Sequence, residues 1–271
     1  MRRDIKAVSP AVATVIMIAA VMVLIFVAMS YASSVLDSRL AENEFSANQQ
    51  FMATTGLQID DVAWTVGRTQ TISYASRYGY VKYYPQALTY TVQINPAAEN
   101  ETFSYTTGMI MYNMPISQYN MGNNYFDRIT PRNSASFLQE GPTAPVGHVF
   151  VVEQLPMDDG NFIRIVAVPS IRNMTSSIGS TDYYKFFLPT LTNSSSNPAL
   201  SQSVTMVGSE VTKVVRSDVD SVRITVSYPS NGDGFNGNFF QFGENSIIQS
   251  WQSPVVVEFY VGAVEVSIGR A

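Results

Sequence analysis

The 271-residue sequence contains no cysteine, which excludes disulfide bonds and cysteine-based metal sites. Histidine is nearly absent as well: His148 is the only one, and it stands in an apparent strand, where we expect a structural role. No nucleophile elbow, phosphate-binding glycine loop or histidine-based metal motif is present. We therefore predict that the protein is not an enzyme and that it uses no cofactor and no metal.

Charge is also scarce, and residues 7–36 carry none. A run of this length exceeds the about 20 apolar residues that a helix needs to cross a bilayer. The segment before it carries Arg2, Arg3 and Lys6 against a single acid, Asp4. Because basic residues tend to stay on the cytoplasmic side, we expect the chain after residue 36 to lie outside the cell.

The residues before the apolar run distinguish it from an ordinary secretory signal. Ser9 is a good N-cap and Pro10 suits the first helical position, so the helix is predicted to begin directly after the basic segment. The small residue Ala7 precedes the apolar run, whereas an ordinary signal peptide has its cleavage site after it. Cleavage between Ala7 and Val8 is therefore predicted, and the mature chain would open on a hydrophobic helix.

This arrangement resembles the N-terminus of archaeal type IV pilins, which carry class III signal peptides. Residues 6–16 carry the resemblance: a basic residue, a small residue, a Val-Ser-Pro start and a β-branched, alanine-rich helix. The close resemblance covers about the first 40 residues. Bacterial type IV pilins have a glutamate near the start of the mature helix, where Val12 and Ala13 stand here, and the archaeal pattern commonly lacks that acid.

The resemblance implies a processing and assembly pathway with several partners. A prepilin peptidase would recognise Lys6, Ala7 and Val8 and remove the leader. The chain would rest in the membrane as a single-pass protein before assembly. An assembly ATPase and a membrane platform protein would then join copies of the chain into a helical, extracellular filament on the cell surface, for adhesion or cell contact.

The helix is expected to continue past the apolar run. Apolar residues recur at a spacing near 3.6, with one interruption at Glu44 and polar residues on the opposite side. No further glycine or proline occurs until Gly56, which would serve as a C-terminal cap. We thus predict one helix from Pro10 to about Thr54. The expected regions are a cleaved leader (1–7), a long helix (8–54) and an extracellular head (55–271).

The remainder of the chain has the alternation typical of β-strands. Residues 88–94 alternate clearly, and residues 102–112 are expected to return as their hairpin partner. Residues 149–154 and 162–168 flank a turn-forming cluster at 157–161. Further strands are expected at 62–66, 222–228 and 255–268. We therefore predict an α+β protein, in which a long N-terminal hydrophobic helix precedes a mainly β, sandwich-like head.

Three N-glycosylation sequons begin at Asn100, Asn173 and Asn193, each in a predicted loop or polar stretch. In an exported archaeal protein we expect glycosylation, foremost at Asn193. The competing explanation is that such triplets arise by chance in a chain rich in Asn, Ser and Thr. The net charge of −5 suits a soluble surface and argues against a nucleic-acid partner.

Two further clusters are better explained by packing than by chemistry. Residues 231–238 hold several oxygen ligands but lack the terminal bidentate acid of a calcium loop, so we expect a turn. Five tyrosines between residues 74 and 84 surround Arg77. They would suit a sugar-binding or redox surface, but strand packing accounts for them without a cofactor site.

The sequence thus predicts a structural subunit of an archaeal type IV pilus-like filament that polymerises through its N-terminal helix. Two alternatives stay open. One is an archaellin, the subunit of the rotating swimming filament, which the Ser9-Pro10 start disfavours. The other is a single-pass membrane-anchored extracellular binding protein that never polymerises. Leader processing separates the anchor from the filament subunits, because a simple anchor keeps residues 1–7.

Overall fold

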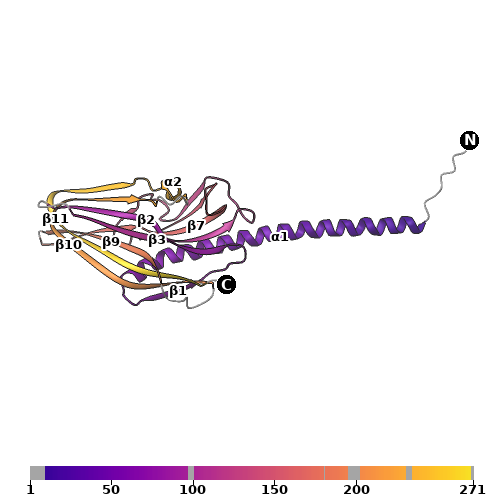
Figure 1. The fold of residues 1–271 in the computed structure, drawn as a ribbon, viewed down its shortest axis with the longest axis horizontal. Coiled ribbons are helices and arrows are strands. Elements are labelled where there is room, and N and C mark those ends of the chain that lie inside the picture. The colour runs from indigo at the N-terminus through magenta and orange to yellow at the C-terminus, as the bar shows by residue number, and fades with distance from the viewer. Residues whose placement is uncertain (1–9, 97–100, 180, 195–201, 230–233, 270–271) are drawn as a thin grey trace, which may run out of the picture. The chain divides into compact units, whose positions relative to one another are not determined.

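The computed structural model describes residues 10–96, 101–179, 181–194, 202–229 and 234–269. The chain divides into two compact units, Met1–Asn43 and Glu44–Ala271. Helix α1 (Pro10–Ala63) begins in the first unit and ends in the second, which we call the head. The head also contains a large sheet and the short helix α2 (Gly237–Phe240) (Figure 1). The predicted α+β class, with a long apolar helix and a mainly β head, is confirmed.

Among the described residues the strands of the head form one 11-stranded sheet. Their order is β4-β6-β7-β3-β2-β10-β11-β9-β8-β5, with β1 paired to β10 outside this path. Neighbours are antiparallel except for the parallel pairs β9/β11 and β5/β8. The strands are β1 (Thr69–Ser73), β2 (Tyr80–Pro96), β3 (Glu101–Pro115), β4 (Tyr125–Thr130), β5 (Leu138–Glu140), β6 (Gly147–Glu153), β7 (Phe162–Pro169), β8 (Ile171–Ile178), β9 (Thr181–Asn193), β10 (Ser203–Ser227) and β11 (Ser246–Gly269).

The end of α1 differs from the prediction. The helix passes through Gly56 and ends at Ala63, so both the expected end at Thr54 and the expected strand at 62–66 are wrong. Gly56 is a close-packing position and not a cap, because a Cβ there would lie 2.5 Å from Val149 Cγ2. Burial of Ile59 and its neighbours outweighs the roughly 1 kcal/mol that a glycine costs inside a helix. The compact head accordingly begins at Glu44 and not at residue 55.

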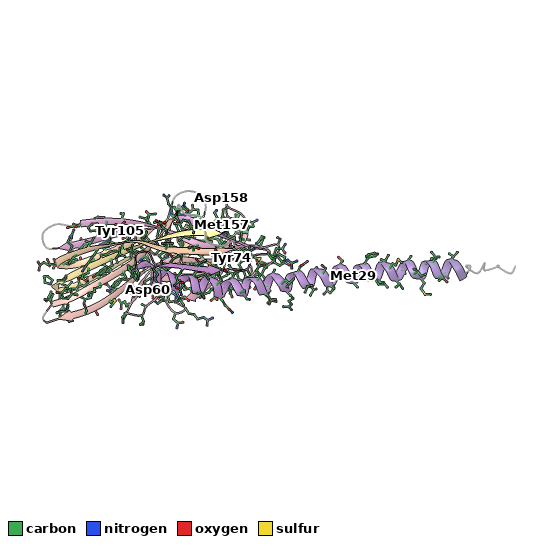
Figure 2. The ribbon with its side chains drawn as sticks, turned by 90° about the horizontal axis from the view of Figure 1, so that it is seen from below. Met29, Asp60, Tyr74, Tyr105, Met157 and Asp158 are labelled. Carbon is green, nitrogen blue, oxygen red and sulfur yellow. The ribbon has the colours of Figure 1, made fainter. Side chains whose placement is uncertain are left out.

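The two hairpins read from the alternation are confirmed. In β2 and β3, Tyr90 pairs with Tyr105 and Ile94 with Glu101. In β6 and β7 the pairing is antiparallel throughout, around the expected turn at 157–161. The buried guanidinium of Arg164 closes this turn by donating to Gly160 O at 3.1 Å and by pairing with Asp159. Figure 2 marks the turn with the labels Met157 and Asp158.

Strands β10 and β11 give the head its sandwich-like form. Their antiparallel ladder is interrupted between Arg216 and Ser221, where two register shifts occur. Bulges of this kind increase local twist and bend the strand. Before the interruption β10 pairs with β1, and beyond it β10 pairs with β2. The single sheet can therefore curl around a core to which most of its strands contribute.

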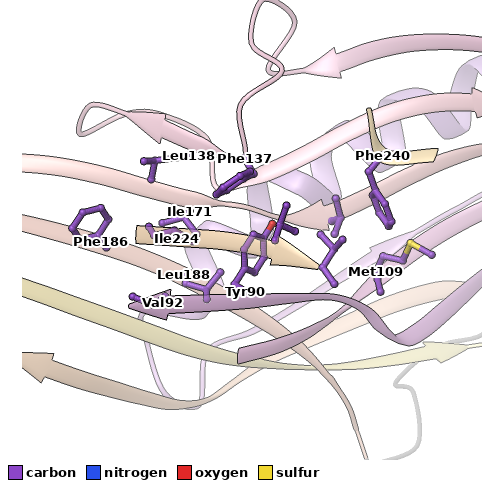
Figure 3. Close-up of a cluster of buried hydrophobic side chains, with 14 of the residues drawn as sticks. Tyr90, Val92, Met109, Phe137, Leu138, Ile171, Phe186, Leu188, Ile224 and Phe240 are labelled. Atoms are coloured by element: carbon purple, nitrogen blue, oxygen red, sulfur yellow. The ribbon is translucent and has the colours of Figure 1, made fainter. Parts of the chain in front are cut away.

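Two clusters of buried side chains fill the head. The first lies within the curled sheet and includes Tyr90, Phe137, Phe186 and Ile224 (Figure 3). The buried hydroxyl of Tyr90 is hydrogen-bonded, because its Oη donates to Pro169 O at 2.8 Å. The second cluster joins apolar side chains of α1 between residues 45 and 63 to the sheet.

Strand β6 lies next to the edge strand β4 and is nevertheless buried on both faces. Val149 and Val151 belong to the cluster with the helix, whereas Phe150 and Val152 belong to the cluster inside the sheet. Successive side chains of a strand point to opposite faces, so one strand can supply both clusters. All seven residues of β6 are buried.

Gly208 on β10 allows the end of α1 to pack closely against the sheet. A Cβ on Gly208 would lie 2.5 Å from the carbonyl oxygens of both Val62 and Thr65. The backbone also exchanges hydrogen bonds here, because Gly67 N donates to Gly208 O at 2.7 Å and Gly208 N donates to Arg68 O at 2.9 Å. The segment that leaves the helix is thus fixed directly to the sheet.

Candidate assembly helix and processing site

The part of α1 in the unit Met1–Asn43 presents apolar side chains on every side. Figure 2 shows side chains standing out all around the helix near Met29, which is 65% exposed. No charged residue occurs on the helix before Asp37. Large apolar residues exposed in this unit are Val12, Val15, Ile16, Met17, Ile18, Val21, Met22, Val23, Leu24, Ile25, Phe26, Val27, Met29, Tyr31, Val35 and Leu36.

This helix is long and apolar enough to cross a membrane. A helix that is apolar all round is stable in lipid or among other helices, because its backbone polar groups are paired internally. Ser34 Oγ adds to this by donating to Tyr31 O at 2.9 Å. Small residues spaced four apart, such as Ala28 and Ala32, let a neighbouring helix approach closely. The apolar surface and the small residues of this segment therefore suit both a membrane span and the core of a helix bundle.

The predicted processing residues fall at the edge of the structure. Lys6, Ala7, Val8 and Ser9 lie outside the described residues, so cleavage after Ala7 stays a prediction. Pro10 is the first residue of α1 and also the first described residue, so the predicted start of the helix stays a prediction.

A buried acid on α1 holds a loop of the head. The Glu44 carboxylate accepts hydrogen bonds from the backbone N–H groups of Arg77, Tyr78 and Gly79 at 3.0–3.2 Å. It also accepts one from Tyr112 Oη at 2.7 Å. Glu44 is only 9% exposed, so these donors replace water around the charge.

Asn48 adds to the contact between α1 and the loop that Glu44 holds. Asn48, one turn further along α1, donates through Nδ2 to Ala75 O at 2.8 Å and to Glu44 O at 2.9 Å. Burial, reinforced by the neighbouring Glu44 carboxylate, raises the pKa of Tyr112, so its hydroxyl keeps the proton that it donates. Sequence reasoning treated Glu44 only as an interruption of the apolar stripe. An acid on the apolar face of a helix was the signal that could have revealed hydrogen-bonding partners buried around it.

The three sequons have different outcomes. Asn193 is exposed at the end of β9, while Asn100 lies outside the described residues. Asn173 is not in a loop: it lies in β8, is 5% exposed, and its Nδ2 donates to Gln249 Oε1 at 3.0 Å. Because a glycan would be attached to this same nitrogen, the packing argues against modification of Asn173.

His148 and the turn at 231–238, the remaining candidates from the sequence, take part in packing and helix capping. His148 lies in β6, 3% exposed, with Nε2 3.3 Å from Gln139 Nε2, and burial lowers its pKa to about 4. No group of three or more potential metal-ligating His, Cys, Asp or Glu residues occurs among the described residues. In the expected turn at 231–238, residues 231–233 lie outside the described part, and Asn236 caps α2 through its side chain.

The tyrosines near Arg77 are divided between a strand and a loop. Tyr80, Tyr83 and Tyr84 lie in β2, as expected. Tyr74 precedes that strand, and its hydroxyl donates to Gly269 O at 3.0 Å. Tyr83 likewise donates to Leu191 O at 2.9 Å. These contacts tie distant segments of the head together.

No protein-family model, curated protein or solved structure matches this chain.

Proposed function

We propose that this protein is a structural subunit of an archaeal type IV pilus-like surface filament, which polymerises through the N-terminal part of α1 for adhesion or cell contact. The observation that carries the proposal is the uncharged apolar surface on all sides of this helix, preceded by the Lys6-Ala7-Val8-Ser9-Pro10 start. Outside lipid, copies of the same helix are the partners best suited to cover such a surface.

In this proposal the helix has two successive environments. A prepilin peptidase removes residues 1–7 while the helix lies in the membrane. The assembly ATPase and platform protein then transfer the helix into the filament core, where contacts between helices replace those with lipid. The head remains outside, and its two clusters of buried apolar side chains form its core without a partner chain.

Leader processing tests the proposal against a simple membrane anchor. The protein is purified from the cell surface, and mass spectrometry identifies its first residue. We expect Val8, and we expect an Ala7→Phe variant to keep its leader, because the bulky side chain stands beside the bond to be cut. A surface protein that retains Met1–Ala7 would favour the non-polymerising anchored binding protein instead.

A further inference from the structure

The head has a groove of about 750 Å³ between two edges of the curled sheet. One side is formed by the end of β5 and by residues 173–175 of β8, and the other by residues 248–251 of β11. This first part of β11 pairs with β10, whereas β9 pairs with β11 only from Val256 onward. The groove therefore lies where the sheet does not close on itself.

A chain of polar side chains bridges the two sides of the groove. Asn173 Nδ2 donates to Gln249 Oε1 at 3.0 Å, and Gln249 Nε2 lies 3.5 Å from Glu140 Oε1. The buried Oδ1 of Asn173 has no hydrogen-bond partner. Buried acceptors of this kind are normally paired.

An aromatic pair also lines this groove. The rings of Tyr184 and Trp251 are 4.4 Å apart between centroids, tilted by 49°, and both are partly exposed. Both residues also line a second hollow of about 570 Å³, with Asp182 and Asp218. The two hollows thus share the aromatic pair, and the combined surface could hold a ligand longer than a single ring.

The chemistry of the lining selects the class of ligand. No lysine, arginine or histidine lines either hollow, which disfavours an anion. The Glu140 carboxylate, two side-chain amides and the hydroxyls of Thr175 and Ser250 in the groove, with Asp182 and Asp218 in the second hollow, instead match a ligand rich in hydroxyl groups. Aromatic rings provide an apolar surface for the C–H face of a sugar ring.

We propose that this groove binds a neutral oligosaccharide, with Trp251 and Tyr184 as the platform, the Glu140 and Gln249 side chains as hydrogen-bonding partners, and Asn173 holding Gln249 in place. This site does not depend on polymerisation. An extended peptide added to the open edge of β11 would bind through backbone groups and would need neither the amides nor the aromatic pair.

The test is a binding titration of the full-length protein in detergent micelles. Isothermal calorimetry with maltotriose, cellotriose, mannotriose and triacetylchitotriose should give saturable binding for at least one of these sugars. Trp251→Ala and Gln249→Ala should each weaken that binding about tenfold or more. Tyr80→Ala removes another exposed ring, which does not line the groove, and should leave the affinity unchanged.

The variants also separate binding from folding. Thermal unfolding is measured for each, and Gln249→Ala provides a change at a half-exposed side chain if Trp251→Ala proves unstable. Absence of binding to all four trisaccharides up to about 10 mM would overturn the proposal. So would a sugar affinity that neither groove variant changes, or displacement of the sugar by a β-strand-forming peptide with equal binding of that peptide to all variants.

Discussion

Replacing Glu44 by alanine should release the loop at residues 77–79 from α1 and destabilise the head. The carboxylate accepts hydrogen bonds from three backbone N–H groups and from the buried Tyr112 hydroxyl. Hydrogen bonds to charged groups contribute about 1.5–3 kcal/mol each, and a buried donor left unpaired costs about 1–3 kcal/mol. Removing the carboxylate also removes its desolvation cost, which offsets part of this loss. We expect a net decrease of about 3–5 kcal/mol in the free energy of unfolding.

Urea unfolding of the full chain in detergent measures this effect. Both tryptophans, Trp64 and Trp251, lie in the head, so their fluorescence reports the unit in question. Glu42→Ala is the matched control, because Glu42 lies on the same helix and makes an exposed ion pair with Arg39 at 2.8 Å. This control should change the free energy of unfolding by less than about 0.5 kcal/mol.

Amide hydrogen exchange locates the effect. The N–H groups of residues 77–79 should exchange faster in Glu44→Ala than in Glu42→Ala, since only the first variant removes their acceptor. Equal stability of the two variants, with unchanged exchange at residues 77–79, would refute the role assigned to Glu44.

Three other predictions concern the head. Gly208→Ala should lower the free energy of unfolding by about 1–3 kcal/mol, because the new Cβ would meet the carbonyl oxygens of Val62 and Thr65. Gly243→Ala, which has an ordinary contact at 3.5 Å, should change it by less than about 0.5 kcal/mol, and equal effects in urea unfolding would contradict the close approach. Burial lowers the pKa of His148 from 6.5 to about 4, so the unfolded chain takes up a proton first as the pH falls. The full contribution of neutral His148 to the free energy of unfolding should be present above pH 6.5, and about 2–3 kcal/mol of it should be lost between pH 6.5 and 4. In urea unfolding across that range, His148→Gln should not show this loss. A pH profile that is the same in His148→Gln as in the wild type would contradict the prediction. Peptide mapping of the protein purified from its native cells should find glycan on Asn193 and none on Asn173, whereas a glycan on Asn173 would contradict the observed packing of β8.

The local patterns were sufficient for the hairpins. Alternation in residues 88–94 and 102–112 reflects strands that pair with each other, so the information lies within one short stretch of chain. The end of the helix was missed for the opposite reason. Gly56 signals a cap when read locally, but its contact with Val149 comes from a strand far along the chain.

The same difference explains the sites. The apolar, uncharged helix can be read directly from consecutive residues. The role of Glu44 could not, because its donors come from residues 77–79 and 112. Asn173 looked like part of a polar stretch, yet its neighbours in β5 and β11 bury it. Features that depend on residues close together in the sequence can therefore be predicted from it. Features that depend on contacts between residues far apart in the sequence cannot.

Electron microscopy of the mature protein after detergent removal tests the central claim most directly. The chain beginning at Val8 should form filaments. Val23→Asp adds a charge at a 61% exposed apolar position of the helix, at a cost of about 2.5–3.5 kcal/mol on membrane-insertion scales. That cost recurs in every subunit, so filaments should be absent while the head keeps its fold. Filaments that form normally with Val23→Asp, or a mature wild-type chain that stays dispersed, would contradict assembly through the helix.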